Sequence, residues 1–323
     1  MNTHNQLNNN DKFDIPILLI VFNRPLLTEK LVNTLRFIKP SKIYVVADGP
    51  RENSKDDILL CKKTEKIIND NINWHCEVKK KIRGKNIGLK KNINDGLNWF
   101  FQNEEMGIIL EDDCDASKSF YEFCEVLLKK YKLDNKIKMI SGNYYLSSVY
   151  EADSYYFSRC PGTHGWATWR RVWNENDTEM TGWKKYKDFF WLLFLFNMNF
   201  IKAHFFYKKF NDSFNLIIDS WDYQLLYSIW KRNGLIIRPY KSLCKHIGSG
   251  NDATNSKGIK DINIQSKIKV KEMQFPISHP TKFKINSNFD SLEIKDIRGL
   301  RFFNYLGYKI VKKMYTYLKL EKK

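Results

Sequence analysis

The segment 107–113, with the sequence GIILEDD, constrains the fold of this 323-residue chain more than any other. An apolar run typical of a buried strand ends without a break at three carboxylates, Glu111, Asp112 and Asp113. Adjacent like charges repel one another, so they favour a position beside a cation, and hard divalent ions such as Mg²⁺ and Mn²⁺ prefer oxygen ligands. Ligands of open α/β sheets bind at the carboxyl ends of strands. We therefore expect a divalent cation here, and the alternative is a solvated acidic loop.

Strand and helix patterns alternate along the first half of the chain. The apolar runs 15–22 and 43–47 have strand length, and a helical pattern from Thr28 to about Ile38 separates them, with Thr28 as the expected N-cap. This order, with short links, is typical of a parallel sheet. Further helices are expected at 56–69, 89–101 and 119–131, and further strands at 74–82, 107–110, 138–141 and 154–158. The expected fold class is α/β, with a mostly parallel, Rossmann-like sheet and flanking helices.

Charge and cysteine usage narrow the choice of partner and compartment. The chain carries 54 basic and 36 acidic side chains, a net charge of +18, which favours an anionic partner such as a nucleotide, a nucleic acid or a membrane surface. No signature of an RNA-binding, zinc-finger or helix-turn-helix module occurs, so nucleic acid is not expected. The six cysteines form no CxxC pair, and the first dozen residues lack the apolar centre of an export signal. We therefore expect a cytoplasmic protein.

Composition divides the chain into a flexible tail at 1–13, a main domain at 14–260 and an extension at 261–323. The main domain carries an aromatic-rich helical insert at 182–215, whose longest apolar run, 189–196, is too short for a bilayer, which needs about 20 residues. The insert is either a buried helix pair or a surface for a membrane or a lipid-linked substrate. The extension is expected to end in a basic amphipathic helix, which either meets an anionic membrane or packs on its own domain.

Four short motifs follow one another in a fixed order. They are VFNRP at 21–25, DGPR at 48–51, EDD at 111–113 and GWATW at 165–169. Each motif alone is weak, but the ordered set, over roughly residues 14–255, resembles glycosyltransferases of the GT-A fold. The likeness is nearest to bacterial family-2-like enzymes and more distant to the inverting N-acetylglucosaminyltransferase I group. It implies a metal-dependent transfer of a sugar from a nucleotide-diphosphate donor.

The resemblance also implies a division of labour among the three acids. The last of them, Asp113, would hold the metal ion, and Glu111 and Asp112 would contact the ribose and the donor sugar. In an extended chain alternate side chains point to opposite sides, so Glu111 and Asp113 share one side and Asp112 takes the other. Two distinct roles are therefore geometrically reasonable. The implied metal ion is Mn²⁺ or Mg²⁺, which would neutralise charge developing on the leaving diphosphate.

Three more residues are implied as donor contacts. Asp48, at the end of the second strand, would contact the base or the ribose, and Arg24, at the end of the first, would lie beside it. Lys90, and equally Lys91, follows the turn at 86–88 and would offset phosphate charge. Without the resemblance, these residues are a turn aspartate, a surface arginine and the solvated start of a helix.

The segment 164–169 resembles the family's loop beneath the donor sugar and the acceptor. Gly165 would let the backbone approach a ligand closely. Trp166 and Trp169 could stack on sugar faces, although both are also candidates for core packing. His164 stands where a tryptophan is more usual, which implies an altered fit of the acceptor.

An inverting transferase needs one general base to take the proton of the attacking hydroxyl. Trp221 and Asp222 resemble the Trp-Asp pair that opens a helix in the family and supplies this base. Asp219 is the alternative, because it could equally be the N-cap of that helix. If Asp219 caps, Asp222 lies in the first turn, where the helix dipole keeps it ionised. His246 lies in a segment that resembles the closing loop and could contact metal or diphosphate; a structural role is the alternative.

The sequence therefore predicts a metal-dependent, inverting glycosyltransferase of the hexosyltransferase type. The expected donor is a UDP-sugar, and the expected acceptor is a cell-surface glycan such as lipopolysaccharide, O-antigen or capsule. The acceptor is either a free glycan or a lipid-linked one at the inner face of the membrane. One alternative is a nucleotidyltransferase that makes sugar nucleotides, but the glycine-rich basic loop expected after the first strand is replaced by residues 23–25, NRP. A non-enzymatic binder of anionic polymers is the other.

Overall fold

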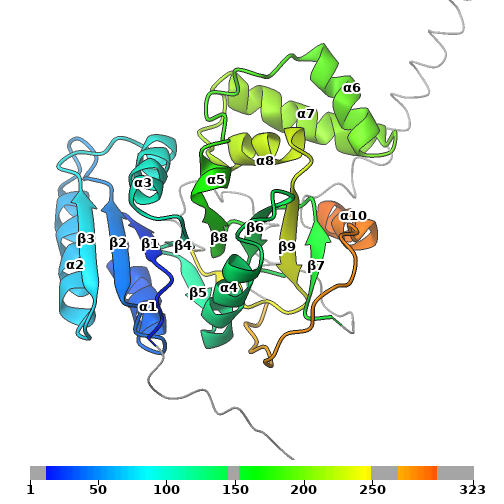
Figure 1. Ribbon diagram of the computed structural model, residues 1–323. Helices are drawn as coiled ribbons and strands as arrows, with labels where there is room; N and C mark the ends of the chain where they lie inside the picture. The colour runs from blue at the N-terminus through cyan, green and yellow to red at the C-terminus, as the bar shows by residue number, and fades with distance from the viewer. Residues whose placement is uncertain (1–11, 145–152, 249–267, 297–323) are drawn as a thin grey trace, which may run out of the picture.

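The computed structural model describes residues 12–144, 153–248 and 268–296 (Figure 1). Residues 1–11 of the predicted tail at 1–13, and the predicted basic helix near the carboxyl terminus, lie outside the described residues. The helices and strands, in chain order, are β1 (Ile17–Val21), α1 (Pro25–Leu35), β2 (Lys42–Ala47), α2 (Lys55–Asn71), β3 (Glu77–Ile82), α3 (Leu89–Asn103), β4 (Met106–Glu111), β5 (Cys114–Ala116), α4 (Lys118–Lys130), β6 (Ile137–Ser141), β7 (Tyr155–Ser158), β8 (Trp166–Trp169), α5 (Arg170–Trp173), α6 (Tyr186–Leu195), α7 (Phe200–Phe214), α8 (Asp222–Lys231), β9 (Leu235–Pro239), β10 (Cys244–His246) and α10 (Ser287–Asp296).

Eight strands form the central sheet, in the order β3-β2-β1-β4-β8-β6-β9-β7. The four strands at the β3 end are parallel to one another, as the alternating strand and helix patterns predict. β8 runs antiparallel between β4 and β6, and β7 runs antiparallel to β9 at the far edge. The α/β fold class is confirmed, with a large sheet and helices on both faces (Figure 1).

The order of the strands reverses beside β1. From β1 the chain proceeds outward to β2 and β3, then returns through α3 to form β4 on the other side of β1. In open α/β sheets the crevice for a ligand lies at such a switch point, outside the carboxyl ends of the strands. The carboxyl ends of β1, β2 and β4 are therefore where a binding site is expected.

Helices cover both faces of the sheet, and side chains of β1 alternate between the two layers of core. Ile17, Leu19 and Val21 belong to the layer that α1, α2 and α4 cover, whereas Leu18 and Ile20 belong to the layer that α3 and α5 to α8 cover. All five residues of β1 are buried. A central strand buried on both faces explains the uninterrupted apolar run in the sequence.

Helix α1 begins earlier than predicted. Its first residue is Pro25 and its N-cap is Arg24, so Thr28 is not the cap. Proline is favoured at the first helical position because its missing N–H would be unpaired there in any case. Thr28 is buried and its Oγ1 donates a hydrogen bond to the Arg24 carbonyl oxygen at 3.0 Å. The early start places the Arg24 side chain at the end of β1.

The aromatic insert forms two helices, α6 and α7, which pack on each other, and α7 packs on α8 (Figure 1). Phe206 and Phe210 of α7 are buried against Trp230 of α8, with ring centroids 4.7 and 5.6 Å away. The predicted helix pair is thus present, and α7 joins it to the main body. Among the residues that the structure describes, no helix is long and apolar enough to cross a membrane.

The described part of the predicted extension, residues 268–296, packs on the main body. Ser119 donates its backbone N–H to Glu272 Oε2 at 2.9 Å, and the Met273 N–H donates to Ser119 Oγ at 2.8 Å. Helix α10 follows, and its Asp290 accepts a hydrogen bond from Ser158 of β7 at 2.5 Å. These contacts join the segment to α4 and to the edge of the sheet.

Close packing at the start of β4 leads to a testable prediction. A Cβ added at Gly107 would overlap the Phe100 ring and lie 2.8 Å from the Pro16 carbonyl oxygen, whereas one added at Gly84 would meet no atom within 4 Å. We expect Gly107→Ala to lower the free energy of unfolding by about 1–3 kcal/mol, because overpacking strains a dense core. Gly84→Ala is the matched control and should leave the free energy of unfolding nearly unchanged. Equal denaturation midpoints for the two variants would contradict this packing.

Candidate active site

The three acids lie where the strand order predicts a ligand. Glu111 is the last residue of β4, and Asp112 and Asp113 form the turn between β4 and β5. β4 is paired with β1 on one side and with β8 on the other. Asp112 and Asp113 are 5% and 8% exposed, so the turn is buried. A solvated acidic loop is therefore the wrong interpretation of this motif.

Arg24 compensates part of the acidic charge. Its Nη1 donates to Asp112 Oδ1 at 3.1 Å and to Asp113 Oδ2 at 2.8 Å, and the Phe22 N–H donates to Asp112 Oδ2 at 3.3 Å. Burial lowers the pKa of Arg24, but the two carboxylates outweigh burial and raise it overall. Arg24 thus lies beside Asp112 and Asp113, at the carboxyl end of β1.

The two buried aspartates differ in charge state. Burial and the neighbouring Asp113 raise the pKa of Asp112 to about 7. Burial also acts to raise the pKa of Asp113, but the hydrogen bond with His246 and the nearby charges outweigh it and lower the pKa to about 2. Asp113 is therefore the carboxylate that is ionised throughout the neutral range, as a metal ligand must be.

Two histidines complete a cluster of possible metal ligands around Asp113. The donor atoms of Asp113, His164 and His246 all lie within 4.8 Å of one another. His246 Nε2 is 3.0 Å from Asp113 Oδ2, and the two imidazole ring centroids are 4.5 Å apart. The register of β10 on β5, which places His246 opposite Cys114, brings His246 to this position.

The cluster fits a divalent cation. Burial lowers the pKa of His164 to about 4, so its imidazole is neutral, and its buried Nδ1 has no hydrogen-bond partner among the described residues. A neutral imidazole nitrogen and an ionised carboxylate oxygen are both metal ligands. Two imidazoles beside one carboxylate suit Mn²⁺ or another transition ion better than Mg²⁺, which prefers oxygen. His164 was not predicted as a ligand, since no local spacing connects it with residue 246.

Asp222 lies close enough to Glu111 to affect its ionisation. Burial, Asp113, Asp112 and Asp222, in that order, raise the pKa of Glu111 well above its usual range. Asp222 is the first residue of α8, and Ser220 Oγ donates a hydrogen bond to its Oδ1. A carboxylate in the first turn is favoured by the helix dipole.

Residue Asp219 does not cap α8. The N-cap is Trp221, whose ring stacks on Trp166 of β8 with centroids 5.6 Å apart. Asp219 is exposed and precedes the helix by three residues. The stack fixes the start of α8 against the central sheet and thereby positions Asp222.

The segment 166–169 is a buried strand, β8, and not a loop. Trp169 is 2% exposed, and its Nε1 donates to the Leu128 carbonyl oxygen at 3.1 Å, so its predicted stacking on a sugar is wrong. Trp166 is 1% exposed, which likewise leaves no ring face for a sugar, although its buried Nε1 has no partner among the described residues. Gly165 has φ +75°, and a Cβ there would lie 2.5 Å from Cys244 Sγ, so packing and backbone conformation both require glycine.

Asp48 organises a loop at the end of β2. Its Oδ1 accepts from the N–H groups of Gly49 at 2.9 Å and Ile87 at 3.0 Å, and its Oδ2 accepts from Asn86 Nδ2 at 2.9 Å. Burial raises the pKa of Asp48, although these N–H groups act in the opposite direction. Asp48 therefore holds the turn before α3, whose first turn carries the half-buried Lys90.

A second carboxylate, Asp57, ties together the ends of β1 and β2, and it was missed from the sequence. Asp57 accepts from Asn23 Nδ2 at 2.7 Å, from Arg51 Nε at 2.6 Å and from Arg51 Nη2 at 2.8 Å. Its side chain is 2% exposed. The residue lies at the start of α2, where it looked like an ordinary first-turn acid.

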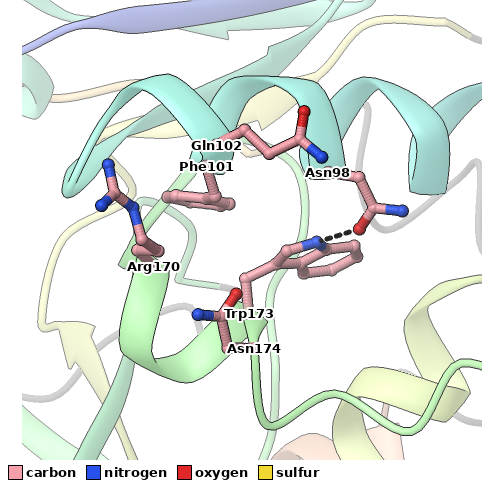
Figure 2. Close-up of a pocket in the computed structure, with 6 residues that line it drawn as sticks. All are labelled: Asn98, Phe101, Gln102, Arg170, Trp173 and Asn174. Carbon is pink, nitrogen blue, oxygen red and sulfur yellow. Dashed lines mark hydrogen bonds between the residues drawn. The ribbon is translucent and has the colours of Figure 1, made fainter.

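None of the three acids lines the small pocket that Figure 2 shows. This pocket has a volume of about 300 Å³ and lies between α3 and α5. Trp173 Nε1 donates to Asn98 Oδ1 at 2.7 Å on its wall. Arg170, another lining residue, donates its backbone N–H to the Glu105 carbonyl oxygen, just before β4 begins. The pocket is thus near the opposite end of β4 from Glu111, and no predicted site residue lines it.

Comparisons with known proteins yield only distant structural likenesses. No protein-family model matches the chain, and no curated protein matches it in sequence. The inositol-1-phosphate CTP transferase from T. maritima is similar over 81% of this chain and 98% of its own, with 12% identity and a TM-score of 0.40. The mannosyltransferase PcManGT from Pyrobaculum calidifontis, solved with GDP-Man and Mn²⁺, is similar over 67% of this chain and 70% of its own, with 11% identity and a TM-score of 0.35.

A third structure, HddC from Yersinia pseudotuberculosis, is similar over 50% of this chain and 80% of its own, with 10% identity and a TM-score of 0.31. Identities this low and TM-scores below 0.5 leave the function to the geometry of the site. The resemblance to GT-A glycosyltransferases therefore stays a prediction.

The Asp57 cluster predicts a pH-dependent contribution to stability. The hydrogen bonds from Arg51 hold the pKa of the Asp57 carboxyl well below its usual value of 3.8. A carboxyl whose pKa is depressed by folding stabilises the protein above its unfolded pKa, and this contribution is lost as the pH falls. We expect Asp57→Asn to lower the free energy of unfolding by about 2 kcal/mol at pH 7.

The difference in free energy of unfolding between Asp57→Asn and wild type should shrink as the pH falls below about 4. Denaturant titrations between pH 3 and pH 7 measure it. Asp56→Asn is the matched control, because the neighbouring Asp56 is exposed in the same helical turn. A pH-independent difference for Asp57→Asn would contradict the assigned role.

Proposed function

We propose that this chain is an enzyme that transfers a sugar from a nucleotide-diphosphate donor to a hydroxyl acceptor, with the aid of a divalent cation. One observation carries the proposal. The metal-ligand cluster around Asp113 lies at the switch point of an α/β sheet, and the carboxylate of Asp222 acts electrostatically on the adjoining Glu111. A leaving diphosphate needs cationic compensation and an attacking hydroxyl needs a base, and the arrangement offers groups for both.

Asp113, His164 and His246 would hold the cation. When bound, it would act as a Lewis acid that offsets the negative charge on the leaving diphosphate. Arg24 adds a second cationic group at the same edge, bound to Asp112 and Asp113. Arg24 and His246 both contact Asp113 Oδ2, so the guanidinium lies beside the proposed cation site, where it would also attract a phosphate oxygen.

Asp222 is proposed as the general base. The acceptor hydroxyl would give its proton to the Asp222 carboxylate as its oxygen bonds to the anomeric carbon and the bond from that carbon to the diphosphate oxygen breaks. A single displacement of this kind inverts the anomeric configuration. Glu111, whose pKa is raised by burial and by the neighbouring acids, would contact a hydroxyl of the donor sugar.

The resemblance stated above supports a more specific form of the proposal. It points to a UDP-sugar as donor, a hexosyl group as cargo and a cell-surface glycan as acceptor. The nucleotidyltransferase alternative would need backbone N–H groups of a glycine-rich loop after β1 to cradle a triphosphate. Here Asn23 and Arg24 are bound to acids and Pro25 begins α1, so the loop is short and already engaged.

Metal-dependent nucleotide binding tests the first half of the proposal. We expect calorimetry to detect UDP binding that requires Mn²⁺ and that weakens at least tenfold in Asp113→Asn, because this carboxylate would be a ligand. Asp115→Asn is the matched control, since Asp115 lies two residues on and pairs with Lys245 at 3.6 Å. Unchanged binding in Asp113→Asn would contradict the proposal, and no UDP binding in either metal state would contradict UDP as the donor nucleotide.

Loss of the base tests the second half. We expect Asp222→Asn to lower kcat about 10²- to 10⁴-fold while donor affinity changes little, because a general base acts in the transition state. Asp219→Asn should keep most activity, since Asp219 is exposed. The measurement is release of UDP from a panel of UDP-sugars. Release of pyrophosphate from UTP and a sugar phosphate would instead identify a nucleotidyltransferase.

A further inference from the structure

Helix α6 carries a row of exposed apolar side chains. Tyr186, Phe190 and Phe194 recur at every fourth position and are 79%, 60% and 71% exposed, and Met198, in the turn after the helix, is 63% exposed. Residues four apart lie on one face of a helix. The opposite face carries Leu192, which is fully buried. The row is thus a continuous outward-facing surface, called here the α6 face.

The charged side chains between residues 184 and 204 are almost all positive. Lys184, Lys185 and Lys187 are exposed at the start of the helix, and none of them forms a salt bridge with another described residue. From 184 to 204 the only acid is Asp188. It is buried, and it accepts a hydrogen bond from Lys231 Nζ at 2.6 Å. An approaching partner therefore meets apolar rings bordered by free ammonium groups.

We infer that the α6 face docks on an anionic phospholipid surface. Large apolar side chains beside lysines are the pattern of a helix that lies in the membrane interface, with rings among the acyl chains and ammonium groups at the headgroups. Ten residues of α6 extend about 15 Å, half the roughly 30 Å of a bilayer core, so the helix lies along the surface and does not cross it.

A second copy of the chain fits this face less well. Two α6 faces in contact would offer the exposed lysines of either copy no acidic partner, because the only acid between 184 and 204 is the buried Asp188. Anionic headgroups are complementary to the same lysines. Electrostatic attraction to anionic lipids adds roughly 1 kcal/mol for each lysine near the surface.

Docking through α6 would have a consequence for the site. Helix α6 packs on α7, and α7 packs on α8, which begins at Asp222 (Figure 1). A bilayer in contact with α6 would therefore lie on the same side of the sheet as α8, the helix that begins with the proposed base, Asp222. This last consequence rests on the proposed function: an acceptor anchored in the bilayer would reach the site from that side.

Vesicle flotation of the full chain tests the inference. The probes are vesicles of phosphatidylcholine with 30% phosphatidylglycerol, compared with pure phosphatidylcholine. We expect binding to the anionic vesicles that weakens at high salt and that falls at least tenfold in Phe190→Ser/Phe194→Ser. The matched control is Phe37→Ser/Leu133→Ser, since Phe37 and Leu133 are 69% and 89% exposed elsewhere on the surface. This control should bind like wild type.

A second variant isolates the charge. Replacing Lys184, Lys185 and Lys187 by glutamine should weaken binding to anionic vesicles and leave any binding to neutral vesicles unchanged. Equal binding by wild type and Phe190→Ser/Phe194→Ser, or no binding by wild type, would overturn the inference. So would a wild-type dimer that the same variant converts to a monomer. Vesicle binding is measured without donor or metal, so its failure and that of the proposed function are distinguishable.

Discussion

The burial of adjacent carboxylates at the end of β4 is the constraint on which the rest of the site depends. Asp112 and Asp113 are both less than a tenth exposed, and removal of an ionised carboxylate from water is costly unless a partner compensates it. The protein supplies Arg24 from the end of β1 and His246 from β10. These two groups belong to different elements. The charge of the turn at Asp112 and Asp113 therefore favours particular positions of both the end of β1 and β10.

Hydrogen-bonded loops and an aromatic stack surround these groups and keep them in place. Asp57 joins the loops after β1 and β2, and Asp48 holds the turn before α3. The Trp166–Trp221 stack fixes the start of α8. Rigid elements with bonded loops hold the reactive side chains in fixed positions, which is a general requirement of preorganised sites.

Local patterns were enough to predict most of the first half of the fold. The apolar runs of β1, β2 and β4 and the helical periods of α2 to α4 are short-range features, and the end of β4 followed from the acids themselves. The antiparallel strand β8 was missed, because the tryptophans of its sequence resembled a sugar-binding loop. Its pairing with both β4 and β6 buries Trp169, and that pairing is a long-range property.

The candidate site was predicted only in part, for the same reason. Asp113 and Asp222 stand in motifs that can be recognised, whereas His164 depends on the tight turn at Gly165 and on the packing of Cys244 against it. The partners of Arg24 depended on where α1 begins, which Pro25 decides. The exposure of the α6 row could not be separated from core packing by periodicity, because both give the same spacing.

The antiparallel pairing of β5 with β10 has a consequence for when the site can form. It joins Asp113 to His246 across 133 positions of the chain, whereas Arg24 lies 89 positions before Asp113. During synthesis the acids and Arg24 therefore emerge before His164 and long before His246. Contacts so distant in sequence form late, because loop closure must precede them. A chain that binds a cation through Asp113, His164 and His246 together would thus already have folded the carboxyl-terminal half of the sheet.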